Sequence, residues 1–155
     1  KNNYEIDQWR LNSSFSTNDA TVTDWERVDD ATSTKIGTGM SESSGVFTFP
    51  RTGLWLVTVH INIRITGTDT SAGVYLLVSA NSDVSNDTVG LIYEGVTEYV
   101  ANTNKSGVQS ALINVTDAST FRFKIQTTNL GNADIMGNTN YNRTSILFER
   151  KGDAQ

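Results

Sequence analysis

The chain has 155 residues, of which 37% are hydrophobic and 19% are charged, and its formal net charge is −5. This length fits one domain with its own core, while the acidic balance and a pI near 4.7 argue against a nucleic-acid partner. The absence of cysteine excludes disulfides and thiolate metal sites.

Three short strands are predicted in the N-terminal third. Trp9 alternates with Leu11, and residues 21–29 alternate again around Trp25. Residues 35–40 predict a third strand that glycines interrupt. The connecting segments are rich in Ser, Thr, Asn and Asp, which favours loops over helices.

The central stretch, residues 42–64, predicts a strand, a turn and a long strand. Pro50 and Gly53 mark the turn, because proline cannot donate to a β-ladder and glycine tolerates positive φ. Six apolar residues then share one face of the long strand: Trp55, Val57, Val59, Ile61, Ile63 and Ile65. The opposite face carries Leu54, Leu56, Thr58, His60, Asn62 and Arg64.

The second half of the chain continues the pattern of short apolar alternations separated by turn residues. Strands are predicted at 74–79, 89–99, 108–115, 120–127 and 145–150, and loops or turns at 66–73, 81–87, 102–107 and 129–142. Many strands at this spacing, with no amphipathic helical window, predict an all-β sandwich or barrel.

A family resemblance rests on the central stretch. Gly45-Val46-Phe47-Thr48-Phe49-Pro50, followed by Gly53-Leu54-Trp55, resembles the signature of the C1q/TNF-like jelly roll. Residues 25–45 are similar to C1q-like modules in virion proteins of marine bacteriophages, and 144–148 resembles the closing strand of that fold. The resemblance implies a single jelly-roll domain over residues 1–155 that forms a homotrimer. It comes without the collagen Gly-X-Y run that many members carry.

The same resemblance implies an interface. In that family the corresponding long strand belongs to an inner sheet whose outer face packs around a three-fold axis. The implied interface residues are Leu54, Leu56, Thr58, His60, Asn62, Arg64, Leu112, Leu147 and Glu149. We expect Glu149 to neutralise Arg64, because it follows Leu147 on the same face. The alternative is that this face is an ordinary solvated surface.

Metal chemistry has little basis in the sequence. His60 is the only histidine, so a histidine metal or anion site would need three copies on an axis, and a hydrogen-bonded interface histidine is the simpler interpretation. Oxygen side chains recur at Asn81, Asp83, Ser85 and Asp87, as they do in calcium loops. The EF-hand glycine and final glutamate are missing, so an Asx-rich turn explains the spacing. We expect no cofactor, with calcium as the alternative.

A catalytic site is not expected either. Catalysis by a Ser-His-Asp triad would have to use His60, which lies in the middle of a strand without a nucleophile elbow. The loop 129–142 mixes amides, hydroxyls and an aromatic ring, which suits recognition of a glycan or a protein. Its candidate ligand residues are Asn138, Asn140 and Tyr141, and the alternative is a solvated loop.

These features lead to one functional expectation with two alternatives. We expect a non-enzymatic trimeric head domain of a phage virion protein, in a tail fibre, a tail-associated tip or a capsid-surface fibre. Its expected partners are a host cell-surface glycan or protein and other virion proteins, with no nucleic acid and no membrane insertion. A secreted or cell-surface microbial adhesin or ligand is the first alternative, and a carbohydrate-active enzyme is the second. Because the sequence starts at Lys1, we expect a fragment or a processed product.

Overall fold

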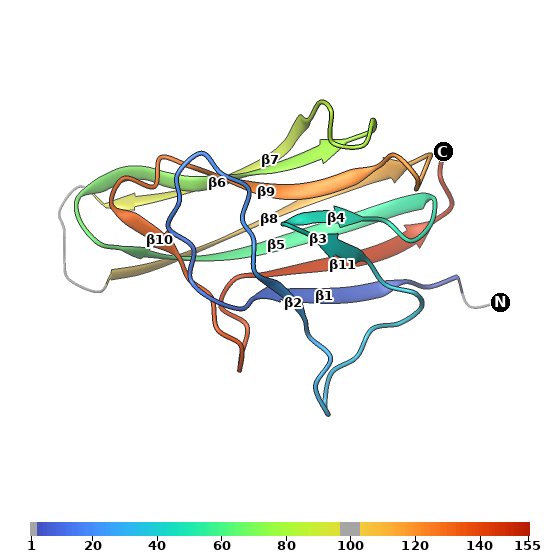
Figure 1. The fold of residues 1–155 in the computed structure, drawn as a ribbon, viewed down its shortest axis with the longest axis horizontal. Coiled ribbons are helices and arrows are strands. Elements are labelled where there is room, and N and C mark those ends of the chain that lie inside the picture. Colours follow the sequence, from blue (N-terminus) through green and yellow to red (C-terminus); the bar gives the residue numbers. More distant parts are fainter. Residues whose placement is uncertain (1–2, 97–102) are drawn as a thin grey trace.

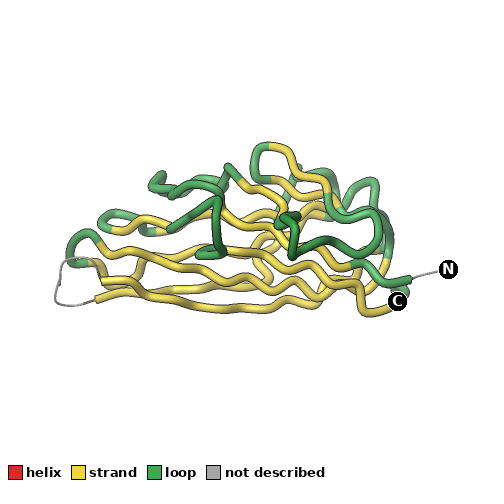
Figure 2. Tube along the Cα trace, turned by 90° about the horizontal axis from the view of Figure 1, so that it is seen from below, coloured by secondary structure: helices red, strands yellow, loops and turns green. Residues whose placement is uncertain are grey.

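The computed structural model describes residues 3–96 and 103–155, and every regular element in these ranges is a β-strand. Sheet A has the order β8 (Thr103–Val115), β5 (Gly53–Ile65), β11 (Ser145–Gly152), β1 (Ile6–Leu11) and β2 (Trp25–Arg27), with β10 (Ala133–Ile135) also beside β5. Sheet B has the order β3 (Ser41–Ser43), β4 (Val46–Thr48), β9 (Arg122–Thr128), β6 (Asp69–Ser79) and β7 (Asp87–Val96). The two sheets pack face to face (Figures 1 and 2), which confirms the predicted sandwich.

Strand β5 is the centre of sheet A. It pairs along its whole length with β8, and on its other side with β11 in the first half and β10 in the second. The six apolar residues predicted to face the core are each no more than 1% exposed. The strict alternation of this strand therefore fixes which face of sheet A is buried.

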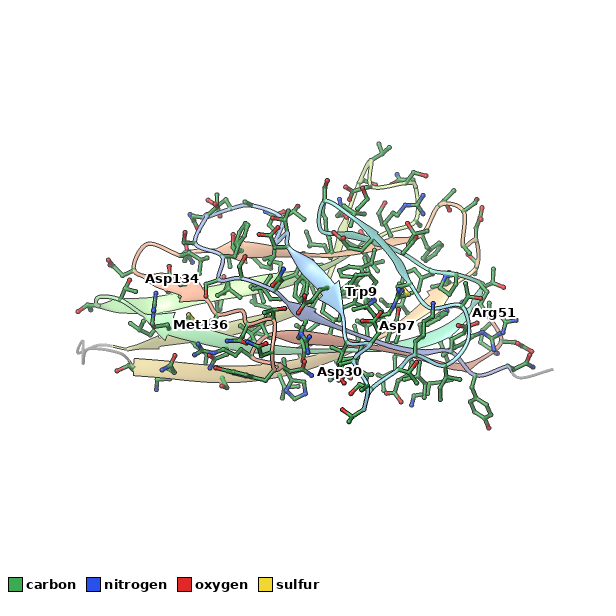
Figure 3. All side chains as sticks on the ribbon, turned by 60° about the horizontal axis from the view of Figure 1, so that its bottom comes forward. Asp7, Trp9, Asp30, Arg51, Asp134 and Met136 are labelled. Carbon is green, nitrogen blue, oxygen red and sulfur yellow. The ribbon has the colours of Figure 1, made fainter. Side chains whose placement is uncertain are left out.

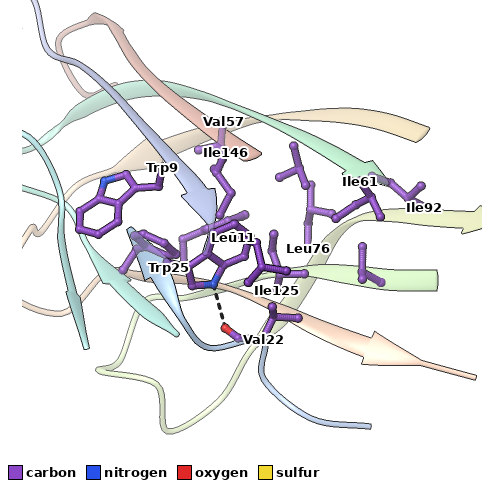
Figure 4. Close-up of a cluster of buried hydrophobic side chains, with 14 of the residues drawn as sticks. Trp9, Leu11, Val22, Trp25, Val57, Ile61, Leu76, Ile92, Ile125 and Ile146 are labelled. Carbon is purple, nitrogen blue, oxygen red and sulfur yellow. Dashed lines mark hydrogen bonds between the residues drawn. The ribbon is translucent and has the colours of Figure 1, made fainter. Parts of the chain in front are cut away.

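Aromatic rings fill the space between the sheets at the end where β5 begins. Phe47 contacts Trp9 edge to face at 5.4 Å between ring centroids, and Phe49 contacts Trp55 at 5.3 Å. Aliphatic side chains from both sheets, including Ile61 and Leu76, continue the core toward the other end (Figure 4). The core is thus continuous from one end of β5 to the other.

A two-residue hairpin joins β3 to β4. Ser44 and Gly45 have φ values of 51° and 84°, as a type I′ turn requires. At Gly45 a Cβ atom would lie 2.3 Å from the carbonyl oxygen of Val22, so any other residue would force a shift. The glycine of the family signature is therefore needed for both the turn and the close approach.

A buried carboxylate ties β1 to its surroundings. Asp7 is 1% exposed and accepts hydrogen bonds from Trp9 Nε1, the Met40 amide and the Arg27 guanidinium, at 2.8 to 3.1 Å. Figure 3 shows Asp7 and Trp9 at the same end of the sandwich as Arg51. Because the charge is both paired and hydrogen-bonded, it holds the segment before β3 against sheet A.

Several predicted element boundaries were wrong. Residues 35–40 contain only the isolated bridge of Ile36 with Ile6. The strand predicted at 21–29 is reduced to β2 and an isolated bridge of Thr21 with Gln126. The turn predicted at 102–107 is the start of β8, apart from residue 102, which lies outside the described residues. The predicted loops 66–73 and 129–142 contain the start of β6 and all of β10, respectively. In 89–99 one continuous strand, β7, covers the described part.

Candidate functional site: the outer face of sheet A

The outer face of sheet A is the side of the sheet that faces away from the core. Register places the alternate residues of four strands on it in rows that cross the sheet. One row joins Leu112, Leu56, Glu149 and Ile6, and the next contains Ser110, Thr58, Leu147 and Gln8. Residues far apart in the chain therefore form one continuous surface.

One end of this face is apolar. We define the apolar end as five residues from β1, β5, β8 and β11: Ile6, Leu54, Leu56, Leu112 and Leu147. Leu112 is 60% exposed, and the other four are half-buried. Val108, 57% exposed, lies farther along β8 on the same face. The cluster is crossed by one charged side chain, Glu149, which lies between Leu56 and Ile6.

The other end is polar and is internally paired. Arg143 donates to Asn62 Oδ1 from Nη2 at 2.9 Å and from Nε at 3.2 Å, and Nη2 also reaches Asn104 Oδ1 at 3.3 Å. Arg64 Nη2 lies 2.7 Å from Asp134 Oδ2. We define the polar end as Asn62, Arg64, Asn104, Asp134 and Arg143. Figure 3 shows Asp134 far from Arg51, at the opposite end of the sandwich.

The predicted partnership of Arg64 and Glu149 is wrong within one protomer. Glu149 lies opposite Leu56 and pairs with Lys151 at 2.9 Å. Leu56 and Arg64 are eight residues apart on β5, which corresponds to about 26 Å along a strand. Asp134 neutralises Arg64 instead, since β10 places the two residues directly opposite each other.

Comparisons with solved structures identify the architecture. The chain superposes on the "Eiger TNF" structure from S. frugiperda with a TM-score of 0.76 at 15% identity, covering 98% of this chain and 95% of that one. It superposes on murine APRIL with a TM-score of 0.67 at 12% identity, covering 96% and 99% of the two chains. The chain has the TNF-like jelly-roll fold. No family model and no curated protein sequence matches it.

The jelly roll places His60 in the middle of the outer face. His60 is exposed, and its direct neighbours across the sheet are Val108 and Ser145, neither of which is acidic. Within residues 3–96 and 103–155, no group of three or more His, Cys, Asp or Glu side chains could hold a metal ion. A Ser-His-Asp triad needs an acidic residue beside the histidine, and neither strand neighbour of His60 supplies one.

The candidate ligand residues lie in the loop between β10 and β11, beyond the sandwich edge. The backbone amide of Asn138 donates to the Leu11 carbonyl at 2.8 Å, and its Oδ1 accepts from the Asn140 amide at 2.7 Å. Tyr141 is 57% exposed. The base of the loop is therefore anchored to β1 while its tip presents one aromatic ring to solvent.

The oxygen-rich loop between β6 and β7 is an Asx-type turn. Asn81 Oδ1 accepts from the Ser85 amide at 2.9 Å and from Ser79 Oγ at 2.8 Å. Asp83 pairs with Lys124 Nζ at 2.8 Å. These oxygens stabilise the turn and an ion pair, so the geometry does not favour the calcium hypothesis.

Sequence reasoning missed several residues of the outer face, among them Ile6, Asn104, Val108, Asp134 and Arg143. Val108 could have been found, because it shares the face of Leu112 by parity. Ile6 could have been found in the same way, since its alternation with Gln8 mirrors that of Trp9 with Leu11. Asp134 and Arg143 could not have been found from the sequence, because their placement depends on β10 and on the loop that follows it.

A final observation concerns membranes. The described part of the chain contains no helix that is long and apolar enough to cross a bilayer.

Proposed function

We propose that this chain is a non-enzymatic head domain that forms a homotrimer through the outer face of sheet A. The observation that carries the proposal is the apolar end, whose most exposed member, Leu112, leaves 60% of its surface in water. Covering the exposed part of this leucine stabilises an assembly by about 1–2 kcal/mol. Homotrimers are also typical of the TNF-like fold.

Three-fold symmetry sets a requirement on the contact. A cyclic trimer joins two different surfaces of each copy, so the apolar end must meet a second patch on its neighbour. Strand β8 meets this requirement, because it is an edge strand of sheet A and carries Val108, which lies outside the apolar end. In this arrangement the β8 edge of one copy covers Leu54 and Leu56 of the next, and His60 lies within the contact.

The biological role that we propose is attachment of a phage virion to its host. The similarity of residues 25–45 to C1q-like modules of marine phage virion proteins supports this context, in a tail fibre, a tail tip or a capsid fibre. The loop with Asn138, Asn140 and Tyr141 would contact a host glycan or protein. Three weak sites on one trimer raise overall binding by about 10² to 10⁴ through effective concentration.

A second candidate is a secreted or cell-surface ligand or adhesin without a virion. The likeness in fold to the Eiger TNF and APRIL structures supports it. The two candidates share the trimer and differ in what precedes the domain. Sequencing the coding region upstream of Lys1 separates them: a fibre or tail module supports the virion, whereas a secretion signal supports the ligand.

The assembly is tested with one variant and a binding assay. Light scattering should give a mass of three times 17.0 kDa for the parent protein, and host-cell binding should accompany that mass. Leu112→Asp should give a folded monomer with weakened cell binding, because it places three carboxylates in the apolar contact. A Leu112→Asp protein that remains trimeric would rule out this face as the interface.

A further inference from the structure

The outer face of sheet B, which faces away from the core, carries a cluster of exposed rings and aliphatic groups. Register places Tyr75 of β6 between Leu91 of β7 and Gln126 of β9, and it places Gly73 between Tyr93 and Thr128. Tyr93 is 42% exposed and Leu91 is 39% exposed. Their neighbours Val74 and Ile92 belong to the core, so these side chains must point outward.

The Tyr93 ring covers Gly73, its register partner on the neighbouring strand. A Cβ atom at Gly73 would lie 2.5 Å from Cδ1 of the Tyr93 ring, so the ring occupies the space that any other side chain would need. The hydroxyl groups of Tyr93 and Tyr75 are 3.3 Å apart. Aromatic cover of a glycine stabilises a sheet and explains one side of this ring. It does not explain why the ring and Leu91 remain so open to solvent.

The surroundings of the two rings are polar and uncharged. Across the sheet the neighbours are the amide of Gln126 and the hydroxyl of Thr128. The next row along β6 pairs Leu77 with Lys124, whose ammonium group is bound to Asp83 at 2.8 Å. The chain as a whole carries a net charge of −5, which repels anionic polymers.

We propose that Tyr75 and Tyr93, with Leu91 and Gln126, form a binding platform for a neutral glycan, while Thr128, only 6% exposed, supports the Tyr93 ring from below. The C–H face of a pyranose ring packs on the face of an aromatic ring, whose quadrupole is negative there. The sugar hydroxyls then exchange hydrogen bonds with the two phenols and the Gln126 amide. Rigid tyrosines suit this task, because they offer a large amphipathic surface at low conformational entropy cost.

This platform deepens the proposed attachment function by naming a ligand class and a second place for it. It lies on the sheet opposite the proposed trimer contact, so trimer formation leaves it open. The hydrogen bond with Tyr75 and partial desolvation raise the pKa of Tyr93 above its ordinary value of 10.0. The Tyr93 phenol is consequently a protonated donor at neutral pH.

The test is native affinity electrophoresis in gels that contain laminarin, mannan or dextran, with polygalacturonate as the anionic probe. The parent protein should be retarded by at least one neutral polysaccharide and should not be retarded by polygalacturonate. Tyr93→Ala should weaken that retardation about tenfold, since it removes the stacking ring. Tyr93→Phe keeps the ring and should retain most of the binding, and Tyr75→Phe should lose about fivefold for one hydrogen bond.

The matched control is Tyr4→Ala, which removes an exposed tyrosine ahead of β1 of sheet A and should leave the retardation unchanged, while Tyr141→Ala tests the β10–β11 loop. Three outcomes would overturn the proposed glycan site. These are unchanged binding by Tyr93→Ala, retardation by polygalacturonate alone, and no retardation by any neutral polysaccharide. Loss in Tyr141→Ala alone would assign the glycan to the loop. Leu112→Asp separates this result from the trimer proposal, since a monomer should keep its affinity per site and lose only avidity.

Discussion

The two sheets of this jelly roll bury similar inner faces and turn different chemistry toward solvent. The outer face of sheet A separates leucines at one end from amides and paired charges at the other. The outer face of sheet B instead carries the neutral tyrosine platform. A surface with an apolar end and a polar end suits a copy of the same protein in a fixed register. A flat neutral surface with two rings suits a ligand that binds by stacking.

The largest expected effect comes from a substitution in the core, on which both outer faces depend. Trp55 is fully buried and contacts Phe49, so Trp55→Ala should lower the free energy of unfolding by about 3–5 kcal/mol. Urea denaturation followed by circular dichroism measures this change. Tyr141→Ala, at an exposed position, serves as the control and should change stability by less than about 0.5 kcal/mol. A Trp55→Ala protein as stable as its parent would reverse the face assignment of β5.

The next effect separates the two faces. Leu56→Asp places a carboxylate at the apolar end of sheet A, where a neighbouring copy would cover the charge without pairing it, so the trimer should weaken. Sedimentation velocity should then show monomers at concentrations where the parent is trimeric. The matched variant Leu91→Asp, on the outer face of sheet B, should remain trimeric. If both variants dissociate, or neither does, the distinction between the faces fails.

A smaller effect concerns the polar end. Arg64→Glu places a carboxylate beside Asp134 and removes the ion pair of 2.7 Å, so the trimer should weaken. Because the Arg64 side chain is 41% exposed, solvent limits the change to about 1 kcal/mol or less per pair. Arg122→Glu, on sheet B, is the control and should leave the dissociation constant of the trimer unchanged. Light scattering at several dilutions gives the dissociation constant of each trimer. Equal constants for Arg64→Glu and Arg122→Glu would contradict the account.

The accuracy of the secondary structure predicted from the sequence differs between strands. Strict alternation from Trp55 onward was enough for β5 and for the side on which Leu56 and His60 lie. The polar run at residues 103–107 predicted a turn from its composition, whereas pairing with the long β5 makes it a strand. Local propensity is weak when a neighbouring strand offers a complete hydrogen-bonding ladder.

The candidate sites show the same limit. Leu112 and Leu147 were placed on the correct face, because parity within a strand is a local property. The partner of Arg64 was wrong, because Asp134 lies on a three-residue strand inside a predicted loop. The tyrosine platform was missed as well, since the position of Tyr93 over Gly73 depends on the register between β6 and β7.

The smallest effect is a pH dependence on sheet B. The pKa of Tyr93 is raised above 10.0, mainly by its hydrogen bond with Tyr75, so the folded state favours the protonated phenol. This contribution is fully present below pH 10.0 and is lost as pH rises through the folded-state pKa. Absorbance titration of the phenolates should show one late-ionising tyrosine that Tyr93→Phe removes and Tyr141→Phe retains. An identical late step in both variants would contradict the pairing.

The claim that the outer face of sheet A is a trimer contact is tested most directly by the mass of the isolated domain. Multi-angle light scattering at micromolar concentration should give three times 17.0 kDa for the parent protein. A mass of 17.0 kDa at that concentration would contradict the account and would leave the apolar end as a free surface.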